Sequence, residues 1–179
     1  AMSGARWVQL RGFMISGPGK TAAGSVCVAW EASNIGLWLD DMQVREFETI
    51  VRSGSSGNTL GPNDETIFLE HSNFLRCATV VDNYALNSYH SCITKCHIDD
   101  TVDIVYIARS DAAGAMNSSV TIQDNLLLVT QGVVKLISPT AINTIGIILI
   151  ERNVLEAVSP NSQYLFTTNQ IAANNSIPV

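Results

Sequence analysis

The segment 17–21, which reads GPGKT, has the residue types that bind nucleotide phosphates in a P-loop. In that motif backbone N–H groups cradle the phosphates, so Lys20 would reach the β and γ positions and Thr21 would bind magnesium. The motif also requires a glycine five residues before its second glycine, and that position is Met14. We therefore expect Pro18-Gly19 to form the centre of a type II turn between two strands, with a degenerate nucleotide site at 17–21 as an alternative.

Two serines directly follow histidines, with acids nearby, which raises the possibility of a Ser-His-Asp hydrolase. Ser72 follows His71 and Ser91 follows His90. Adjacent strand residues point to opposite faces of a sheet, so such a pair is badly placed to share a proton. No Gly-x-Ser-x-Gly elbow is present to expose a nucleophile. We keep a hydrolase with its site in the 71–103 region as an alternative, and we assign no catalytic residue.

Several metal-ligating residue types are crowded between positions 90 and 103, but their spacing does not favour an ion site. On an extended strand Cys92 and Cys96 would lie roughly 13 Å apart, which is too far to share one ion. The aspartates are not arranged as in an EF-hand loop. We therefore assign no metal and no cofactor, and we expect four free, mostly buried thiols. The residues considered are His90, Cys92, Cys96, His97, Asp99, Asp100, Asp103 and, across a hairpin, Asp111, with Cys27 and Cys77 as the other thiols.

The composition restricts the partners that this protein can have. Of its 179 residues, 46% are hydrophobic and only 15% are charged, with a net charge of −6. Nucleic-acid binding needs clustered Lys and Arg, whereas the ten basic residues here are scattered. No apolar run is long enough to span a membrane. The length predicts one domain, which we place at 3–160, followed by a polar C-terminal arm or tail at 161–179.

Short apolar runs rich in β-branched residues, separated by turn residues, dominate the chain and predict an all-β protein. The fold class we expect is an antiparallel β-sandwich or a jelly-roll-like barrel with at most one or two short helices. One such helix is predicted over 40–51, where two acids precede Met42, Phe47, Ile50 and Val51, with a strand as the alternative. No internal repeat is apparent. We place strands at 5–15, 25–31, 66–70, 74–81, 89–98, 101–108, 119–122, 126–130, 133–137, 144–151 and 163–167.

Two of the expected strands carry a family resemblance. The segments GSVCVAW at 24–30 and NTIGIILI at 143–150 resemble strands in the projecting domains of small RNA-virus capsid proteins. The resemblance implies a structural and binding module on the virion surface that forms a dimer or trimer and attaches to a host-cell receptor, without catalysis. Loops such as 53–65 and 109–118 would contact the partner. Trp7, Trp30 and Trp38 are expected as core or rim anchors, and Trp38 would also suit an interface.

Overall fold

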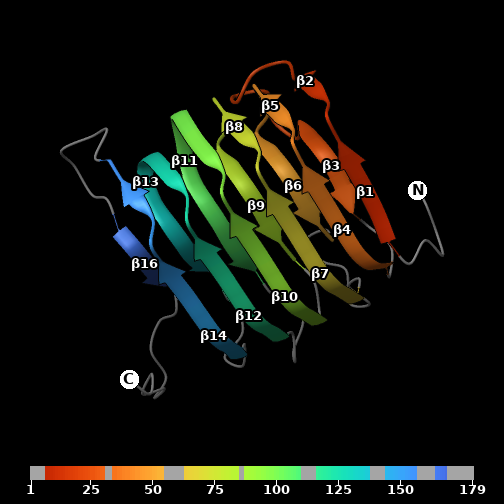
Figure 1. Cartoon of the computed structure of the whole chain (residues 1–179), viewed down its shortest axis with the longest axis vertical. Coiled ribbons are helices and arrows are strands. Elements are labelled where there is room, and N and C mark those ends of the chain that lie inside the picture. Colours follow the sequence, from red (N-terminus) through yellow and green to blue (C-terminus); the bar gives the residue numbers. More distant parts are fainter. Residues whose placement is uncertain are drawn as a thin grey trace.

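The computed structural model of the chain contains sixteen strands and no helix among the residues that it describes. Every strand pair is parallel (Figure 1). The chain winds in successive coils that stack on one another, which makes the fold a parallel β-solenoid. The described residues are 7–30, 34–54, 63–84, 87–109, 116–137, 144–156 and 164–168.

Each coil contributes one strand to a six-stranded sheet, here called sheet A, with the order β1-β4-β7-β10-β12-β14. Neighbouring strands in this sheet come from consecutive coils, so the rest of each coil serves as the crossover that a parallel pair requires. We number the coils one to six from the strand of sheet A that begins each. These strands are Trp7–Arg11, Asn34–Asp40, Asn63–Glu70, Asn87–Thr94, Met116–Gln123 and Thr144–Glu151.

The other half of each coil lies in a ten-stranded sheet B, which bends around a corner. In coils one to three two short strands flank the corner, whereas in coils four and five a single long strand, β11 (His97–Arg109) or β13 (Leu126–Ile137), passes through it. The pairing of β11 with β13 shifts register between Ile98 and Ile104, where the ladder turns. The remaining strands are β2 (Met14–Ser16), β3 (Val26–Trp30), β5 (Gln43–Arg45), β6 (Thr49–Ser53), β8 (Asn73–Leu75), β9 (Thr79–Asn83), β15 (Val154–Leu155) and β16 (Tyr164–Thr168).

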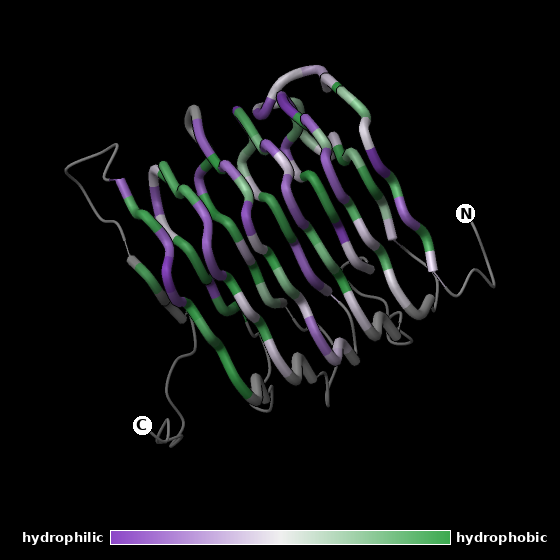
Figure 2. Tube along the Cα trace, in the orientation of Figure 1, coloured by the Kyte–Doolittle hydropathy of each residue, from purple (hydrophilic) through white to green (hydrophobic). Residues whose placement is uncertain are grey.

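The interior is a stack of apolar side chains from equivalent positions of successive coils. Because side chains alternate between the two faces of a strand, hydrophobic and polar residues alternate along much of sheet A (Figure 2). The inward positions of coils two to five are fully buried, for example Leu39, Leu69, Ile93 and Ile122. Some inward positions are polar: the Ser91 hydroxyl lies 3.1 Å from the hydroxyl of Tyr106, which also accepts from Asn83 at 2.7 Å.

A sharp turn separates sheet A from sheet B in every coil, and it repeats at a fixed place in the backbone. The residue after the last sheet A strand residue has a positive φ in each case, which non-glycine residues rarely adopt. The pairing of neighbouring coils on both sides of the turn holds the backbone in this conformation. The residues are Gly12 (φ 73), Asp41 (φ 54), His71 (φ 48), Lys95 (φ 54), Asp124 (φ 57) and Arg152 (φ 52).

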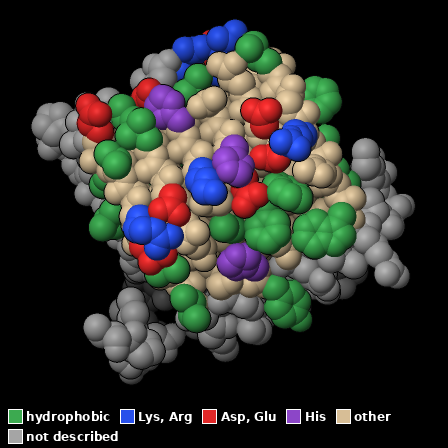
Figure 3. Space-filling model, in the orientation of Figure 1, with side chains coloured by type: hydrophobic (Ala, Val, Ile, Leu, Met, Phe, Trp, Pro, Cys, Tyr) green, Lys and Arg blue, Asp and Glu red, His purple; other side chains and the backbone are tan. Residues whose placement is uncertain are grey.

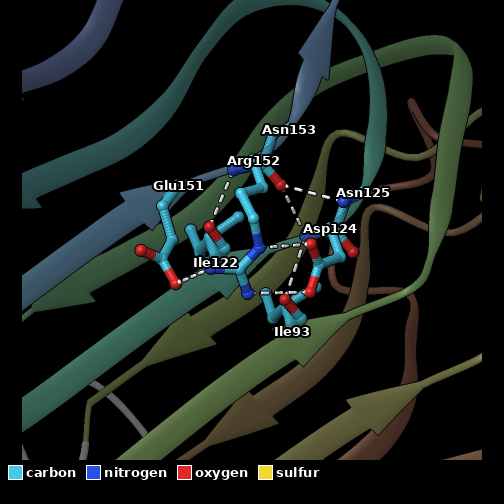
Figure 4. A network of polar contacts seen from close by, with 7 residues as sticks. All are labelled: Ile93, Ile122, Asp124, Asn125, Glu151, Arg152 and Asn153. Carbon is cyan, nitrogen blue, oxygen red and sulfur yellow. Dashed lines mark hydrogen bonds and ion pairs between the residues drawn. The ribbon is translucent and has the colours of Figure 1, made fainter.

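In coils five and six the residue after this turn is an asparagine that points inward and bonds the coil before it (Figure 4). Asn125 accepts from the backbone N–H of Cys96 at 2.8 Å and donates to the carbonyl of Ile93 at 2.9 Å. Asn153 repeats the pattern one coil later, accepting from the N–H of Asn125 at 3.0 Å and donating to the carbonyl of Ile122 at 2.7 Å. We call this pair the asparagine ladder. It satisfies backbone groups that a tight turn leaves unpaired in the interior.

The predicted antiparallel sandwich or jelly roll is therefore wrong, although the all-β class is correct. Alternating hydrophobicity and short apolar runs occur in either strand direction, so they could not distinguish the two arrangements. The expectation of no internal repeat also fails. The positive-φ positions 41, 71, 95, 124 and 152 mark a repeat of 24 to 30 residues, which is conserved in backbone conformation but hardly in residue type.

The helix predicted over 40–51 is also wrong, and the strand alternative is correct. Asp41 and Glu46, with φ values of 54° and 63°, interrupt the segment, so it cannot be helical. Its apolar residues Met42, Phe47 and Ile50 are buried nevertheless. Three of the predicted strands each break at a turn: 5–15, 74–81 and 89–98. The predicted strands 126–130 and 133–137 form one strand, β13. Strand β4 was not predicted, because Asn34 to Gly36 resembled a turn. Of the predicted arm at 161–179, Tyr164–Thr168 forms β16 and the rest lies outside the described residues.

Candidate functional site

An aromatic cleft of about 520 Å³ opens on the outer face of sheet A. We call it the aromatic cleft throughout. Hydrophobic side chains gather on this face of the molecule over the first coils, beside a histidine (Figure 3). Exposed aromatic surface is unfavourable in water, so a cluster of rings on an outer face indicates a binding surface. The lining residues are Trp7, Val8, Gln9, Trp38, Phe68 and Glu70, from strands β1, β4 and β7.

The cleft depends on a glycine that lets one ring lie across a neighbouring strand. Trp7 pairs in register with Gly36 of β4, and a Cβ added to Gly36 would lie 2.5 Å from the indole ring. Because Gly36 has no side chain, the ring lies over β4 and reaches Phe68 of β7. The two ring centroids are 6.3 Å apart with an interplanar angle of 20°. Trp38 meets the same phenylalanine edge-on at 6.5 Å.

Polar groups line the cleft on its side nearest the turn. Gln9 and Glu70 belong to its lining. Beside Glu70 in the sheet, Asp40 binds Arg11 at 3.3 Å and His71 Nδ1 at 3.2 Å. Neither Lys nor Arg is among the described lining residues, so the charge that faces a ligand directly is that of the Glu70 carboxylate.

A histidine extends the row of rings beyond the cleft. The ring of His90 in β10 lies edge-on to Phe68, with centroids 5.8 Å apart. Ser119 Oγ donates to the carbonyl of Tyr89 at 3.0 Å, so His90 Nδ1 must be the donor in its 2.6 Å contact with Ser119 Oγ. Nε2 then carries the lone pair. Burial lowers the pKa of His90, which keeps the ring neutral near pH 7.

The structure separates the serines and histidines considered for a hydrolase. Ser72 and Ser91 are both about 1% exposed inside the coils, whereas His71 and His90 face outward. Ser72 Oγ donates to the carbonyl of Glu70 and accepts from the Met42 N–H, as part of the turn. Both hydroxyls lie inside the coils, so neither can meet a substrate on the outer face. This arrangement favours structural roles for both serines.

The GPGKT segment forms a loop between β2 and β3 and lines a second hollow of about 360 Å³ with Glu46 and Arg76. The N–H groups of Gly17 and Gly19 donate to the carbonyls of Arg45 and Glu46 in the next coil, so they are not free to hold a phosphate. Lys20 binds Asp103 at 3.0 Å. Gly19 has a positive φ of 122°, and the hydrogen-bonded turns of this loop run from Gly19 to Ala22 and from Ala22 to Ser25, not across Pro18-Gly19.

The metal-ligand candidates are dispersed. Within the described ranges no group of three or more His, Cys, Asp or Glu side chains could hold an ion. Cys92 is half-buried on the outer face, whereas Cys96 lies in the interior. His97 pairs with Asp99 at 3.2 Å. Asp103 binds Lys20 and accepts a hydrogen bond from Thr130. Asp111 lies outside the described residues. All four cysteines are free thiols.

Sequence reasoning singled out Trp7 and Trp38 but missed Phe68, Gly36 and the cleft that they form. The signal was available only through the repeat. Trp38 and Phe68 occupy equivalent positions of consecutive coils, and Trp7 is one coil earlier, so an aligned repeat would have placed all three on one face. Trp30, by contrast, is 5% exposed and belongs to the core.

No family model, no curated protein and no solved structure matches the chain. Nothing in these comparisons links it to a viral capsid protein. In the part of the chain that the structure describes, no helix is long and apolar enough to cross a membrane.

Proposed function

We propose that the protein is a non-catalytic binding module whose aromatic cleft holds a neutral carbohydrate. The observation that carries this proposal is the ring of Trp7, laid flat over Gly36 and stacked toward Phe68. A sugar ring presents a face of C–H groups that packs on an aromatic face, and a rim of hydroxyls that need hydrogen-bond partners. Gln9 and Glu70 stand beside the rings and offer both donors and acceptors.

The charge of the cleft supports a neutral ligand over an acidic one. The Glu70 carboxylate is the charged group among the described lining residues, and it would repel a uronic or sialic acid. Arg11, which shares the row of Glu70 in the sheet, is already bound to Asp40. A cleft open to solvent on a regular sheet also suits a linear chain of sugars, since the ligand can continue past the rings on either side.

Attachment to a receptor, expected from the sequence, is compatible with this proposal and remains a prediction. A hydrolase would need an accessible nucleophile, and the two serines considered for that role are buried. The proposal therefore places the function in the outer face and gives the interior a purely structural role.

Tryptophan fluorescence tests the proposal directly. Two of the three tryptophans line the cleft and the third is buried, so titration with neutral oligosaccharides such as cellohexaose and maltohexaose should change the emission of Trp7 and Trp38. Trp7→Ala and Phe68→Ala should weaken binding at least tenfold, about 1.4 kcal/mol. Tyr89→Ala is the matched control, because Tyr89 is an exposed ring (53%) outside the cleft lining.

Two outcomes would count against the carbohydrate. If neutral sugars at millimolar concentration leave the spectrum unchanged while a proline-rich peptide alters it, the cleft binds peptides. If Trp7→Ala and Tyr89→Ala bind sugar equally well, the aromatic cleft is not the site. Glu70→Gln should retain neutral sugars and improve the binding of acidic ones, since it removes the negative charge but keeps hydrogen-bonding groups.

A further inference from the structure

The exposed apolar side chains of this protein are concentrated at the two ends of the solenoid. Ten large hydrophobic residues are exposed among those described. Three lie in the first coil and five in the sixth. The other two are Tyr89 in the fourth coil and Leu126 in the fifth, and Leu126 pairs directly with Val154 of the sixth coil. A terminal coil has a neighbouring coil on one side only, so its apolar side chains stay open to solvent unless something covers them. The residues at the ends are Trp7, Phe13 and Met14 in the first coil, and Ile147, Leu149, Val154, Leu155 and Leu165 in the sixth.

The ends are also where the sheets have unpaired edges. Among the described strands, β1 and β14 are the edge strands of sheet A. The inward side chains of these coils, such as Val8 and Ile148, are only partly buried, whereas their equivalents in the middle coils are fully buried. An edge strand with an apolar flank is a template for pairing with another chain unless something covers it. Solenoids need their terminal coils covered for the same reason.

The register of the coils makes one end complementary to the other. Following the pairings from strand to strand, Ile147 of the sixth coil occupies the same column as Trp7 of the first. On sheet B, Val154 occupies the same column as Met14. If the first coil of one molecule followed the sixth coil of another at the spacing of the solenoid, these exposed apolar residues would become cross-strand neighbours.

The charges at the ends agree with this register. Arg11 and Glu151 share a third column of sheet A, the one beside the turn. Arg11 is 68% exposed at one end, and Glu151 is 37% exposed at the other. In the stacked arrangement Arg11, bound to Asp40 in its own molecule, would lie beside Glu151, which is bound to Arg152, so the two ends would meet with residues of opposite charge in this column.

We propose that copies of this chain stack head to tail, with the first coil of one molecule pairing in parallel with the sixth coil of the next. Sheets A and B then continue from molecule to molecule. Such an interface is heterologous, because two different surfaces meet, so the assembly grows along the solenoid axis instead of closing as a dimer. The outer face of β14 would border Trp7 of the next copy, so the rows of outward side chains run on across the junction.

A complementation experiment with the whole chain tests the geometry. Met14→Asp disables the first-coil end and Val154→Asp disables the sixth-coil end; both residues are more than 60% exposed, so the fold should tolerate the changes. By light scattering after gel filtration, the unaltered protein should exceed its monomer mass of 19.3 kDa increasingly with concentration. Each variant alone should remain monomeric. An equimolar mixture should give a species of twice the monomer mass and nothing larger, because each variant retains one intact end.

Tyr89→Asp is the control, since Tyr89 is also exposed but lies in a middle coil, and it should associate like the unaltered protein. Circular dichroism establishes that the variants are folded; if an aspartate unfolds the chain, Met14→Gln and Val154→Thr replace it in the same mixture. A monomer at every concentration would overturn the proposal. So would association of either single variant, which would indicate contact between identical ends, or a mixture of folded variants that stays monomeric.

Discussion

Asn153 Oδ1 accepts two hydrogen bonds from Asn125 of the coil before it, one from the backbone N–H at 3.0 Å and one from the side-chain Nδ2 at 2.9 Å. Asn125 in turn accepts from the Cys96 N–H and donates to the Ile93 carbonyl of its own preceding coil. Earlier in the chain the position holds Cys96, whose thiol donates to the carbonyl of Leu69, and Ser72, whose hydroxyl accepts from the Met42 N–H. At this one position of the coil, an amide, a thiol and a hydroxyl side chain each form a hydrogen bond with the backbone of the preceding coil.

Replacing Asn125 should test how much the ladder stabilises the corner. Asn125→Ala leaves the Cys96 N–H and the Ile93 carbonyl unpaired in the interior, and each such group costs about 1–3 kcal/mol. We expect the free energy of unfolding in urea to fall by about 2–5 kcal/mol. Asn153→Ala is the matched comparison in the last coil, where water can replace the lost partners, so its effect should be smaller. Equal, small effects of both changes would show that the ladder contributes little.

Gly36→Ala should disrupt the aromatic cleft without changing any ring. The added methyl group would lie 2.5 Å from the Trp7 indole, so the ring must lift away from β4 and lose its stacking with Phe68. We expect a red-shifted tryptophan emission and weaker sugar binding. In a Trp7→Ala background the same substitution should have no further effect on stability, and this double-mutant cycle isolates the contact. An unshifted spectrum would mean that Trp7 does not lie over Gly36 in solution.

The buried thiols predict a loss of stability at alkaline pH. Burial raises the pKa of Cys77 to about 12 and that of Cys96 to about 12, against 9.0 for an exposed thiol. Below pH 9 the folded and the unfolded chain both keep these protons, so the two thiols do not change the free energy of unfolding. Between pH 9 and 12 the unfolded chain loses protons that the native state retains, and stability should fall by up to about 1.4 kcal/mol per pH unit for each thiol.

The measurement is urea unfolding between pH 7 and 11, compared with a Cys77→Val variant whose curve should fall less steeply above pH 9. At pH 8 the reagent DTNB should label Cys77 and Cys96 only as fast as the chain opens, since burial also blocks access. Rapid labelling of all four cysteines in the native state would contradict the burial of these two.

Part of the candidate site was visible in the sequence and part was not. Trp38 could be assigned to an interface from its residue type. The adjacent His-Ser pairs could be set aside from strand alternation, and the opposite placement of His90 and Ser91 in β10 agrees with that argument. Phe68 carries no local signal, because an aromatic residue in an apolar run looks like core. Its outward position follows only from the register of β7 with β4, which depends on residues about 30 positions away.

The sequence by itself determined the class of local structure: short β-branched runs broken by turn residues allow strands, and their period of two decides which side chains share a face. It also determined that the surface carries few charges. Only the tertiary structure decided that the strands run parallel and that Trp7, Trp38 and Phe68 meet on one outer face. Strand direction and register are set by hydrogen bonds between coils, and a single strand has the same side-chain alternation whichever neighbour it pairs with.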